Sequence, residues 1–390
     1  MSCSDLLIIG AGPAGSAAAL RARALGLRVV LLADQGRPPG VVESLPPAGR
    51  RLLVDLGCWQ SFVDSKPTPS RGVRSVWGSS HPVERSSIRD PDGPGWHLDR
   101  AVFDAFLQAQ AIRAGAELRH GRLRSVRLRS VRQGDELIEC ADAAGNVLTS
   151  RFLLDASGRS AAAAGRLGAR RRYDDAAVAT ISGYRVAASD TDLRTVIEAT
   201  PAGWWYSLRA EGADGPARVV GRVGDADLDT GIDTGIETVP DVMPPGVREL
   251  LGGAHLQLPP RRVAANSGYL QPFAGPRWAA AGDAALSFDP LSSQGLLTAL
   301  FTGRAAAQAI AATLAGSDQA IADYARRLSA IRQAYQANLA LYYGAERRWA
   351  AEPFWARRHG GPTIEAGRTS PEPALSQARS ARSTAGQGLV

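Results

Sequence analysis

The hydrophobic pattern near the start of the chain predicts a strand, a helix and a second strand in close succession. Leu6 to Ile9 form a short continuous apolar run, which is typical of a buried parallel strand. An alanine-rich segment from Ser16 to Ala24 predicts a helix that ends at Gly26, and Arg28 to Leu32 predict a second apolar strand. We therefore expect a strand–helix–strand unit of about 30 residues.

Beyond this unit, the chain carries patterns of several kinds. The clearest are helical spacing over 99–114, alternation over 117–139 and a buried apolar run over 151–155. Between about 170 and 265 the segments are strand-like and aromatic, and two long helices are expected near 293–314 and 318–349. The periodicity thus separates a strand-rich middle from a helical end.

These segments predict an α/β protein in which a Rossmann-like domain is interleaved with a second domain. We assign 1–165 and 270–315 to the Rossmann-like domain, because apolar strands that lead into turns and helices occur in both. We assign 166–269 to a β-sheet-rich domain for the substrate and 316–358 to a helical C-terminus. Residues 359–390 are polar and unpatterned, so we expect a disordered tail there.

The turn after the first strand has the glycine spacing of a dinucleotide-binding site. Gly10 permits a tight turn, Gly12 lets the backbone approach a pyrophosphate, and Gly15 lets the helix pack close to the strand. Pro13 and Ala14 complete the turn, and phosphate would lie at the helix N-terminus, where free N–H groups attract it. An ordinary glycine turn is the alternative, but the position between a strand and a helix favours the dinucleotide.

An acidic residue at the end of the second strand is expected to hold the ribose of such a dinucleotide. The expected position, 23 residues after Gly10, holds Ala33, and Asp34 follows directly. Either Asp34 reaches the ribose through a shifted turn, or it is a solvent-exposed turn residue and the site lacks this contact.

A second strand, turn and helix begin near residue 278. Trp278 to Ala281 predict a short strand, Gly282 and Asp283 a turn, and small residues then lead into a helix that begins near Ser293. A carboxylate at a strand end can hold a ribityl or ribose hydroxyl, and a helix N-terminus can face partial negative charge. Alone, the pattern also fits an aspartate that caps a helix; with the glycine turn, it favours a second contact to one cofactor.

At this point the sequence resembles a known family. The motifs Gly10-x-Gly12-x-x-Gly15, Asp155-Ala156-Ser157-Gly158-Arg159 and Gly282-Asp283 are similar in order and spacing to those of FAD-dependent monooxygenases of the aromatic-hydroxylase superfamily, over about residues 5–315. Asp289-Pro290 to Gly295 and Asp99 to Asp104 resemble the branch of geranylgeranyl reductases, flavin-dependent halogenases and LodB-like proteins. Glu43-Ser44-Leu45-Pro46-Pro47 and Gly203-Trp204-Trp205-Tyr206-Ser207 look most like LodB-like proteins, which modify tryptophan in partner proteins during cysteine tryptophylquinone formation.

The resemblance implies FAD as the cofactor and a set of contacts to it. Outside the glycine turn and Asp34, the implied contacts are Arg100, Asp155, Gly158, Gly282, Asp283, Pro290, Ser293, Gln294, Gly295 and Leu296. Gln294 to Leu296 would lie nearest the isoalloxazine. One departure concerns the substrate side, since Leu208 and Arg209 stand where a proline usually follows the Trp-Trp-Tyr strand.

The resemblance also implies an enzyme, an oxidoreductase that uses NAD(P)H and O₂ to hydroxylate an electron-rich aromatic substrate through a flavin C4a-hydroperoxide. The substrate would be a small molecule, a carrier-bound natural-product intermediate or a tryptophan side chain of a peptide. Because the chain has one glycine fingerprint, NAD(P)H would bind transiently at the flavin, or a separate flavin reductase would supply electrons. The alternatives are a reductase of prenyl-type double bonds, a halogenase and a non-catalytic FAD-binding scaffold.

Three consecutive aromatic residues are the candidates for the substrate face. Trp204, Trp205 and Tyr206 lie in a predicted strand, so their side chains alternate between its two faces. They form either an aromatic wall over the flavin or substrate, in a catalytic role, or part of the core of the inserted sheet. A halogenase would need a reactive lysine between flavin and substrate, and the only lysine of the chain, Lys66, lies in a loop rich in Pro and Ser.

Composition and charge bear on three other classes of protein, namely nucleic-acid-binding, metal-binding and membrane-spanning proteins. The 390 residues carry 45 Lys and Arg against 38 Asp and Glu, but the arginines of 119–132 alternate with apolar residues as on an exposed strand, so we expect no nucleic-acid partner. Three scattered cysteines and five dispersed histidines show no metal-ligand spacing, so we expect no metal. No apolar run is long enough to span a bilayer and no basic segment precedes the first one, which predicts a cytoplasmic protein without a membrane span.

Overall fold

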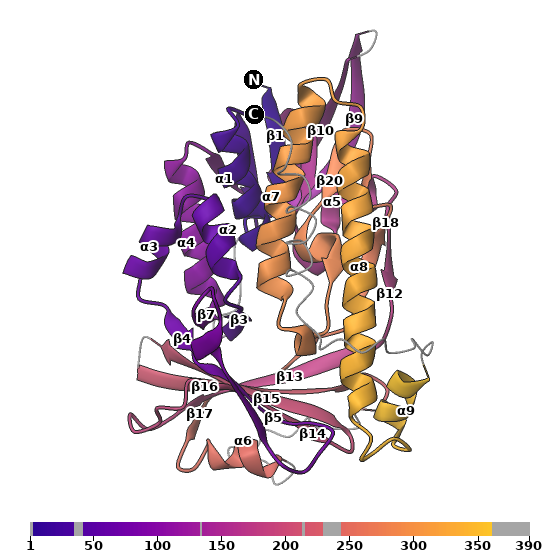
Figure 1. Ribbon diagram of the computed structural model, residues 1–390. Helices are drawn as coiled ribbons and strands as arrows, with labels where there is room; N and C mark the ends of the chain where they lie inside the picture. The colour runs from indigo at the N-terminus through magenta and orange to yellow at the C-terminus, as the bar shows by residue number, and fades with distance from the viewer. Residues whose placement is uncertain (1–2, 35–41, 133–134, 213–214, 229–242, 361–390) are drawn as a thin grey trace, which may run out of the picture.

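Parallel pairing about the first strand builds the sheet in the upper half of Figure 1. The computed structural model describes residues 3–34, 42–132, 135–212, 215–228 and 243–360. The parallel strands, in spatial order, are β8 (Glu117–His120), β2 (Val29–Ala33), β1 (Ser4–Ile9), β11 (Val147–Asp155) and β20 (Trp278–Ala280). Antiparallel strands extend the sheet, namely β19 (Ala274–Gly275), β10 (Asp135–Asp142) and β9 (Leu123–Arg132). The continuous apolar runs of the sequence predicted β1 and β2, because a strand in a parallel sheet is covered on both faces and is therefore apolar on both.

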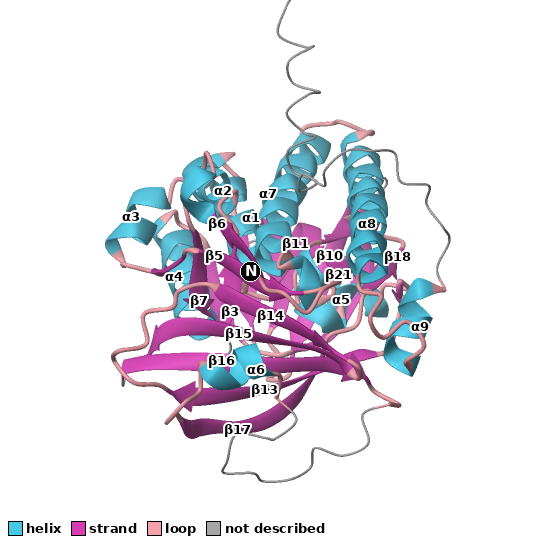
Figure 2. Ribbon diagram, turned by 60° about the horizontal axis from the view of Figure 1, so that its bottom comes forward, coloured by secondary structure: helices cyan, strands magenta, loops and turns pink. Residues whose placement is uncertain are grey.

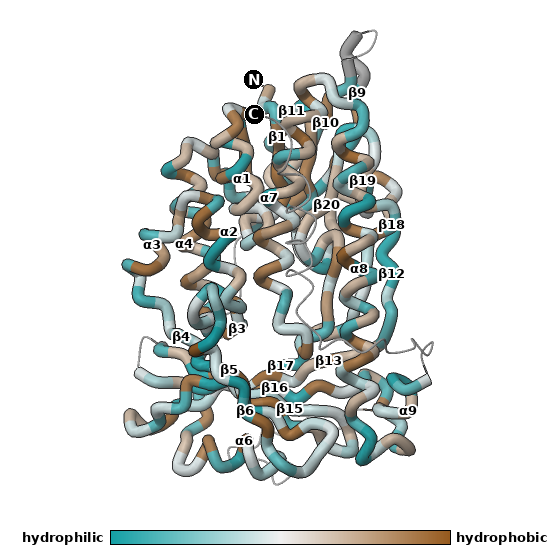
Figure 3. Tube along the Cα trace, viewed as in Figure 1, coloured by the Kyte–Doolittle hydropathy of each residue, from teal (hydrophilic) through white to brown (hydrophobic). Residues whose placement is uncertain are grey.

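Helices cover this sheet, and small residues let them approach closely. α1 (Pro13–Ala24) packs against α4 (Arg100–Arg113) and α7 (Gly295–Leu314), and α8 (Ala320–Ala345) lies beside α7. A Cβ on Gly303 would lie 2.0 Å from the carbonyl oxygen of Ala14, so this crossing of α7 over α1 requires glycine. Figure 3 shows hydrophobic residues along the inner strands β1 and β11 and hydrophilic ones at the outer strand β9. The shorter helices are α2 (Gly49–Asp55), α3 (Trp59–Asp64), α5 (Ala162–Arg166) and α9 (Pro353–His359).

A second, mainly antiparallel sheet forms the lower layer in Figure 1, and Figure 2 shows α6 (Pro245–Glu249) on its outer side. Its strands, in spatial order, are β17 (His255–Ala264), β13 (Ala177–Arg185), β16 (Gly215–Asp225), β15 (Gly203–Gly212), β14 (Thr195–Thr200), β5 (Gly72–Val76) and β6 (Val83–Ser86). The pairing of β14 with β5 is parallel, whereas the other pairings are antiparallel. The face that is turned toward α1 and α7 supplies one wall of the site described below.

Among the described residues, two small sheets and four short turns of 3₁₀ helix connect the layers. One sheet contains β3 (Val42–Leu45), β7 (Gly95–Asp99) and β4 (Thr68–Ser70), and the other contains β12 (Arg170–Tyr173), β18 (Gly268–Gln271) and β21 (Leu286–Ser287). The described 3₁₀ turns are η1 (Ser87–Arg89), η2 (Gly158–Ser160), η3 (Gly282–Ala284) and η4 (Pro290–Ser292). The connecting strands therefore bring the segments around 43, 100, 158 and 290 to the gap between the layers.

The predicted α/β class is confirmed, with a parallel sheet and a helical C-terminal region. The boundary at residue 165 does not follow the layers, because β5 and β6 come before it and pair in the lower sheet. Local pattern cannot show which sheet a short strand joins, since pairing with β14 is a long-range contact. Most of the predicted tail, 361–390, lies outside the described residues. Across the described ranges, the helices are too short or too polar to cross a bilayer.

Candidate functional site

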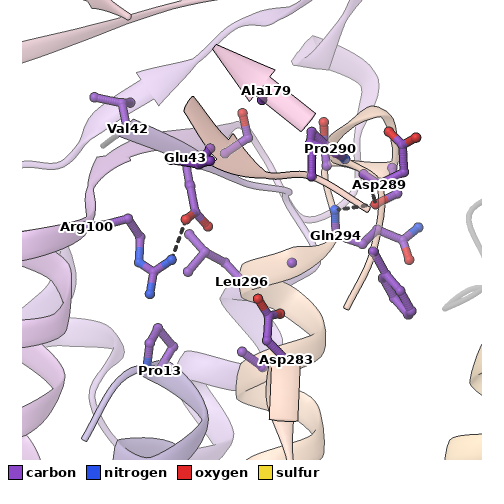
Figure 4. A pocket seen from close by; sticks show the side chains of 18 of the residues that line it. Pro13, Val42, Glu43, Arg100, Ala179, Asp283, Asp289, Pro290, Gln294 and Leu296 are labelled. Carbon is purple, nitrogen blue, oxygen red and sulfur yellow. Dashed lines mark hydrogen bonds and ion pairs between the residues drawn. The ribbon is translucent and has the colours of Figure 1, made fainter. Parts of the chain in front are cut away.

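A cavity of about 540 Å³ lies between the two layers. The first residues of α1 and α7 line one end, and strands β13, β14 and β15 of the lower sheet line the other. Figure 4 shows Pro13 and Asp283 at the first end, Ala179 at the second, and Arg100 and Gln294 on opposite sides. Its volume is in the usual range for a small-molecule or cofactor site.

The turn into α1 has the shape that the glycine spacing predicts. Gly10 has φ +100°, and a Cβ there would lie 2.4 Å from the carbonyl oxygen of Ala156. A Cβ on Gly15 would lie 1.9 Å from the carbonyl oxygen of Gly10, so both glycines shape the turn from behind. Residues 12–14 line the cavity itself, and the N-cap, Gly12, provides no side chain to cap the helix. The first N–H groups of α1 thus remain open to a ligand.

The loop before α7 presents a second open helix terminus. The Asp289 carboxylate accepts a hydrogen bond from the Leu291 N–H at 2.9 Å, and Ser293 adopts a left-handed φ of +50°. The N-cap of α7 is Gln294, whose side chain makes no capping hydrogen bond. A Cβ added to Gly295 would meet nothing within 4 Å, so space lies directly in front of the helix. Its first N–H groups are therefore available for partial negative charge.

These two helix termini fit the pyrophosphate and the isoalloxazine of a flavin dinucleotide. Both α1 and α7 begin at the same cavity without a capping side chain. A pyrophosphate is stabilised by free N–H groups at a helix N-terminus, and the electron-rich edge of a reduced flavin is stabilised in the same way. The geometry of the chain is therefore compatible with FAD, which would lie across the cavity from α1 to α7.

One wall carries an ion-pair network centred on Arg100. Its guanidinium pairs with the Glu43 carboxylate in the cavity and, at 3.2 Å from Nε, with Asp104 behind it. Figure 4 shows Glu43 and Arg100 turned toward each other. Burial lowers the pKa of Arg100, but the charges of Glu43 and Asp104 outweigh burial and raise it overall. Arg100 thus stays cationic and holds the Glu43 carboxylate in the cavity.

Asp283 faces the cavity from η3, close to a second arginine. Its Oδ2 lies 3.6 Å from Nε of Arg159, and its side chain remains 40% exposed. Its position inside the cavity, away from bulk water, raises the pKa of the Asp283 carboxyl, whereas Arg159 and Arg100 lower it and Glu43 raises it further. Arg159 is itself fixed by the Asn266 carbonyl oxygen, to which its Nη1 donates at 2.6 Å. The carboxylate is therefore free to accept a hydroxyl hydrogen bond from the cavity side.

A buried hydrogen-bonded chain supports the opposite wall. The Tyr343 hydroxyl of α8 donates to Asp289 Oδ2 at 2.8 Å and accepts from the Trp204 indole N–H at 3.0 Å. All three side chains are almost fully buried. Burial raises the pKa of Asp289 to about 6, even though the Leu291 N–H and Tyr343 favour the carboxylate. These hydrogen bonds connect the loop before α7 and the pocket-facing Trp204 to α8.

Five of the residues expected to contact the cofactor lie outside the cavity lining: Gly10, Gly15, Asp34, Asp155 and Gly282. Asp155 is fully buried, and its carboxylate accepts from the N–H groups of Ser157, Ala163 and Ala164 at 2.7–3.0 Å, which fixes the loop that carries Gly158. The Gly282 N–H donates to Thr302 at 2.8 Å. Asp34 follows β2 directly, with a side chain that is 68% exposed and 3.9 Å from Arg122.

The remaining predicted contacts line the cavity: Gly12, Pro13, Ala14, Arg100, Gly158, Asp283, Pro290, Ser293, Gln294, Gly295 and Leu296. Of the three aromatic candidates, Trp204 and Tyr206 line it as well, with ring centroids 5.7 Å apart. Trp205 points to the other face of β15, where it packs with Met243 and Val247 near α6. Strand alternation sends neighbouring side chains to opposite faces, so Trp205 has no contact with the cavity.

Two further residues that could serve in catalysis, His97 and Lys66, lie away from the reacting space. His97 is buried, and its ring bonds to the Arg209 carbonyl oxygen at 2.8 Å and to the Thr195 hydroxyl at 3.0 Å. Burial lowers the pKa of His97 to about 4, so it is a neutral, structural residue at ordinary pH. Lys66 is exposed after α3 and does not line the cavity.

The sequence did not identify three charged cavity residues as functional: Glu43, Arg159 and Asp289. Each of the three belongs to a motif on which the family resemblance rests. Their positions in those motifs were the sequence signal from which a functional role could have been predicted. The apolar wall also escaped notice, because its residues come from strands β13, β14, β15 and β17, which are far apart in sequence.

Comparison with known proteins agrees with this geometry. A tryptophan halogenase family model matches residues 77–208, and an FAD binding domain model matches residues 5–39. LodB of Marinomonas mediterranea is 28% identical over 376 residues, which cover 94% of this chain and 99% of LodB. The myxobacterial chondrochloren halogenase CndH superposes with a TM-score of 0.79 at 24% identity, covering 99% of this chain and 91% of that structure. The peptidyl tryptophan dihydroxylase QhpG, which is essential for tryptophylquinone cofactor biogenesis, superposes with a TM-score of 0.71 at 23% identity, covering 95% and 82%. The chain is therefore similar to FAD-binding oxidoreductases, among them LodB and the flavin-dependent halogenases.

Proposed function

We propose that this chain is an FAD-dependent monooxygenase that hydroxylates an electron-rich aromatic substrate. The observation that carries the proposal is the continuous cavity. It joins the open helix termini that suit FAD to an aromatic and apolar wall, and none of the described residues that line it is a lysine. A halogenase of this fold would need such a lysine, whereas oxygen transfer to a ring does not.

Each part of the cavity then has a role that follows from its chemistry. The N–H groups at the start of α1 hold the pyrophosphate, and those at the start of α7 stabilise negative charge on the flavin edge. Asp283 accepts a hydrogen bond from a hydroxyl of the ribityl chain. Trp204 and Tyr206 form the face against which the substrate ring packs and from which water is excluded. The bound flavin supplies the redox chemistry and the activation of O₂.

The overall reaction consumes one O₂ and one NAD(P)H for each hydroxylated ring. One oxygen atom enters the substrate, the other leaves as water, and NAD(P)H with one proton supplies the two electrons. NAD(P)H acts either directly at the flavin or through a separate flavin reductase. The two routes are distinguished by adding NADPH to the purified, FAD-loaded protein without O₂: direct donation bleaches the flavin spectrum, and a reductase requirement leaves it oxidised.

The substrate is proposed to be an aromatic ring presented by a peptide, by a carrier protein or as a small molecule. LodB is similar to this chain over nearly the whole length of both proteins. QhpG, which shares the fold, is a peptidyl tryptophan dihydroxylase. We therefore rank a tryptophan side chain of a peptide first, with natural-product intermediates next.

Halogenation is the second candidate, because the tryptophan halogenase model matches residues 77–208. One experiment separates the two. The FAD-loaded enzyme is reduced and mixed with isotopically labelled O₂, bromide and a tryptophan-containing peptide, and the product is weighed by mass spectrometry. Hydroxylation adds one labelled oxygen whether or not bromide is present. Replacement of a ring hydrogen by bromine would overturn the proposal.

A further inference from the structure

The substrate end of the cavity is almost entirely apolar. Its wall contains Ala179, Ile181, Ile197, Leu208 and Val263, together with the ring of Trp204. The Trp204 indole N–H is already used, since it donates to Tyr343. The hydroxyl of Tyr206, in contrast, has no hydrogen-bond partner among the described residues, and its ring lines the same wall. Very few protein atoms at this end of the cavity are therefore available to bind a polar group of the substrate.

Tyr206 is held in place by the residue opposite it. In the antiparallel pair of β15 and β16, Tyr206 faces Gly221. A Cβ on Gly221 would lie 2.2 Å from Cζ of Tyr206 and 2.4 Å from its hydroxyl oxygen, so the ring occupies the space that any other residue would fill. Two strands of one sheet thus fix the hydroxyl, and its position does not depend on a loop.

A carboxylate lines the same cavity, on β3, the strand that packs against β15. Glu43 enters the cavity from β3 and pairs through Oε1 with Arg100, whereas its Oε2 has no partner among the residues that the structure describes. Burial raises the pKa of Tyr206, and the negative charge of Glu43 raises it further, which is consistent with their facing the same space. The cavity thus offers two hydrogen-bond acceptors, the Tyr206 hydroxyl on the apolar wall and the free oxygen of Glu43 beside Arg100.

We propose that the Tyr206 hydroxyl and the free oxygen of Glu43 recognise the single ring N–H or O–H donor of an aromatic substrate, an indole or a phenol. The inference rests on the proposed function only in placing the substrate at this end of the cavity. A site that is built to accept a hydrogen bond discriminates against a ring that lacks the donor, because the bound ring excludes water from the acceptors and leaves them unpaired. We expect the donor to improve binding by roughly tenfold to a hundredfold.

The test uses isosteric ligand pairs with the FAD-loaded protein. N-acetyl-tryptophanamide is compared with the benzothiophene analogue, which lacks the ring N–H, and N-acetyl-tyrosinamide with N-acetyl-phenylalaninamide. Titration of the flavin absorption gives a dissociation constant for each. The pair with the larger ratio identifies the substrate ring as an indole or a phenol. A ratio close to one in both pairs would overturn the proposal.

Variants assign the discrimination to the named residues. Tyr206→Phe keeps the ring over Gly221 and removes only the hydroxyl, so the ratio should fall at least severalfold while the donor-free ligand binds as before. Glu43→Gln should also lower the ratio. Tyr184→Phe, on β13 and in the cluster on the far side of the same sheet, is the matched control and should leave the ratio unchanged. An unchanged ratio in Tyr206→Phe would refute the role of its hydroxyl. A brominated product combined with the expected ratios would refute monooxygenation but support this recognition.

Discussion

The buried Asp289 carboxyl should make part of the stability depend on pH, and Asp289→Asn tests this. The side chain is 1% exposed, and burial raises its pKa from the ordinary 3.8 to about 6. Because the pKa is higher in the folded than in the unfolded chain, proton binding by this group stabilises the fold below about pH 4. That contribution is lost as the pH rises through about 6. The pKa difference corresponds to about 3 kcal/mol in total.

The amide that replaces the carboxyl in the Asp289→Asn variant stays neutral at every pH and still offers an oxygen to Tyr343. The free energy of unfolding of the wild type should therefore fall relative to that of the variant as the pH rises. The difference between the two proteins should change by about 1 kcal/mol from pH 5 to pH 7, in favour of the variant. Other carboxyl groups titrate alike in both proteins and cancel in the difference. The assay is urea unfolding followed by tryptophan fluorescence at pH 5, 6 and 7.

Tyr343→Phe provides an opposite perturbation. It removes the hydrogen bond that Asp289 accepts at 2.8 Å, so the pKa of Asp289 should rise further and the loss of stability should move to higher pH. A stability difference between Asp289→Asn and wild type that is the same at all three pH values would show that the carboxyl does not titrate as its burial requires.

Three further changes test other parts of the site. Gly10→Ala should abolish FAD loading, because its Cβ would lie 2.4 Å from the Ala156 carbonyl oxygen; normal flavin absorbance in the purified variant would contradict the assignment of the turn. Trp204→Leu should shift the absorption spectrum of the bound flavin. Trp205→Ala should leave that spectrum unchanged and lower the free energy of unfolding by roughly 3–5 kcal/mol. Equal spectral effects of the two variants would contradict the placement of Trp204 and Trp205 on opposite faces of β15. Lys66→Ala should leave the product yield within about twofold of wild type, as for an ordinary surface substitution, and a loss of turnover would restore the halogenase alternative.

Local pattern was sufficient where the structure depends on neighbours in sequence. The strand–helix–strand unit and the glycine turn were predictable because their spacing is set by backbone geometry, as Gly10 and Gly15 illustrate. The helix that begins near 293 was predictable from its apolar periodicity, and α7 begins at Gly295.

Long-range contacts account for what the sequence did not reveal. Glu43 and Arg100 are 57 positions apart, and nothing in their local pattern indicates that they form a pair in the cavity. Strand alternation required that Trp204 and Trp205 face opposite ways, but only the packing of the sheet against α1 and α7 decides which one meets the cavity. Asp155 and Gly158 were both predicted to contact the cofactor. Only the hydrogen bonds of Asp155 reveal that its carboxylate is buried behind the loop that carries Gly158 and holds that loop in place.

The most direct test of the account is a crystal structure of the protein with bound FAD. We predict the pyrophosphate on the N–H groups of Ala14 and Gly15, and the isoalloxazine between the start of α7 and the face of Trp204 and Tyr206. Dinucleotide density elsewhere, or an isoalloxazine remote from residues 294–296, would contradict the central claim that this cavity is the flavin site.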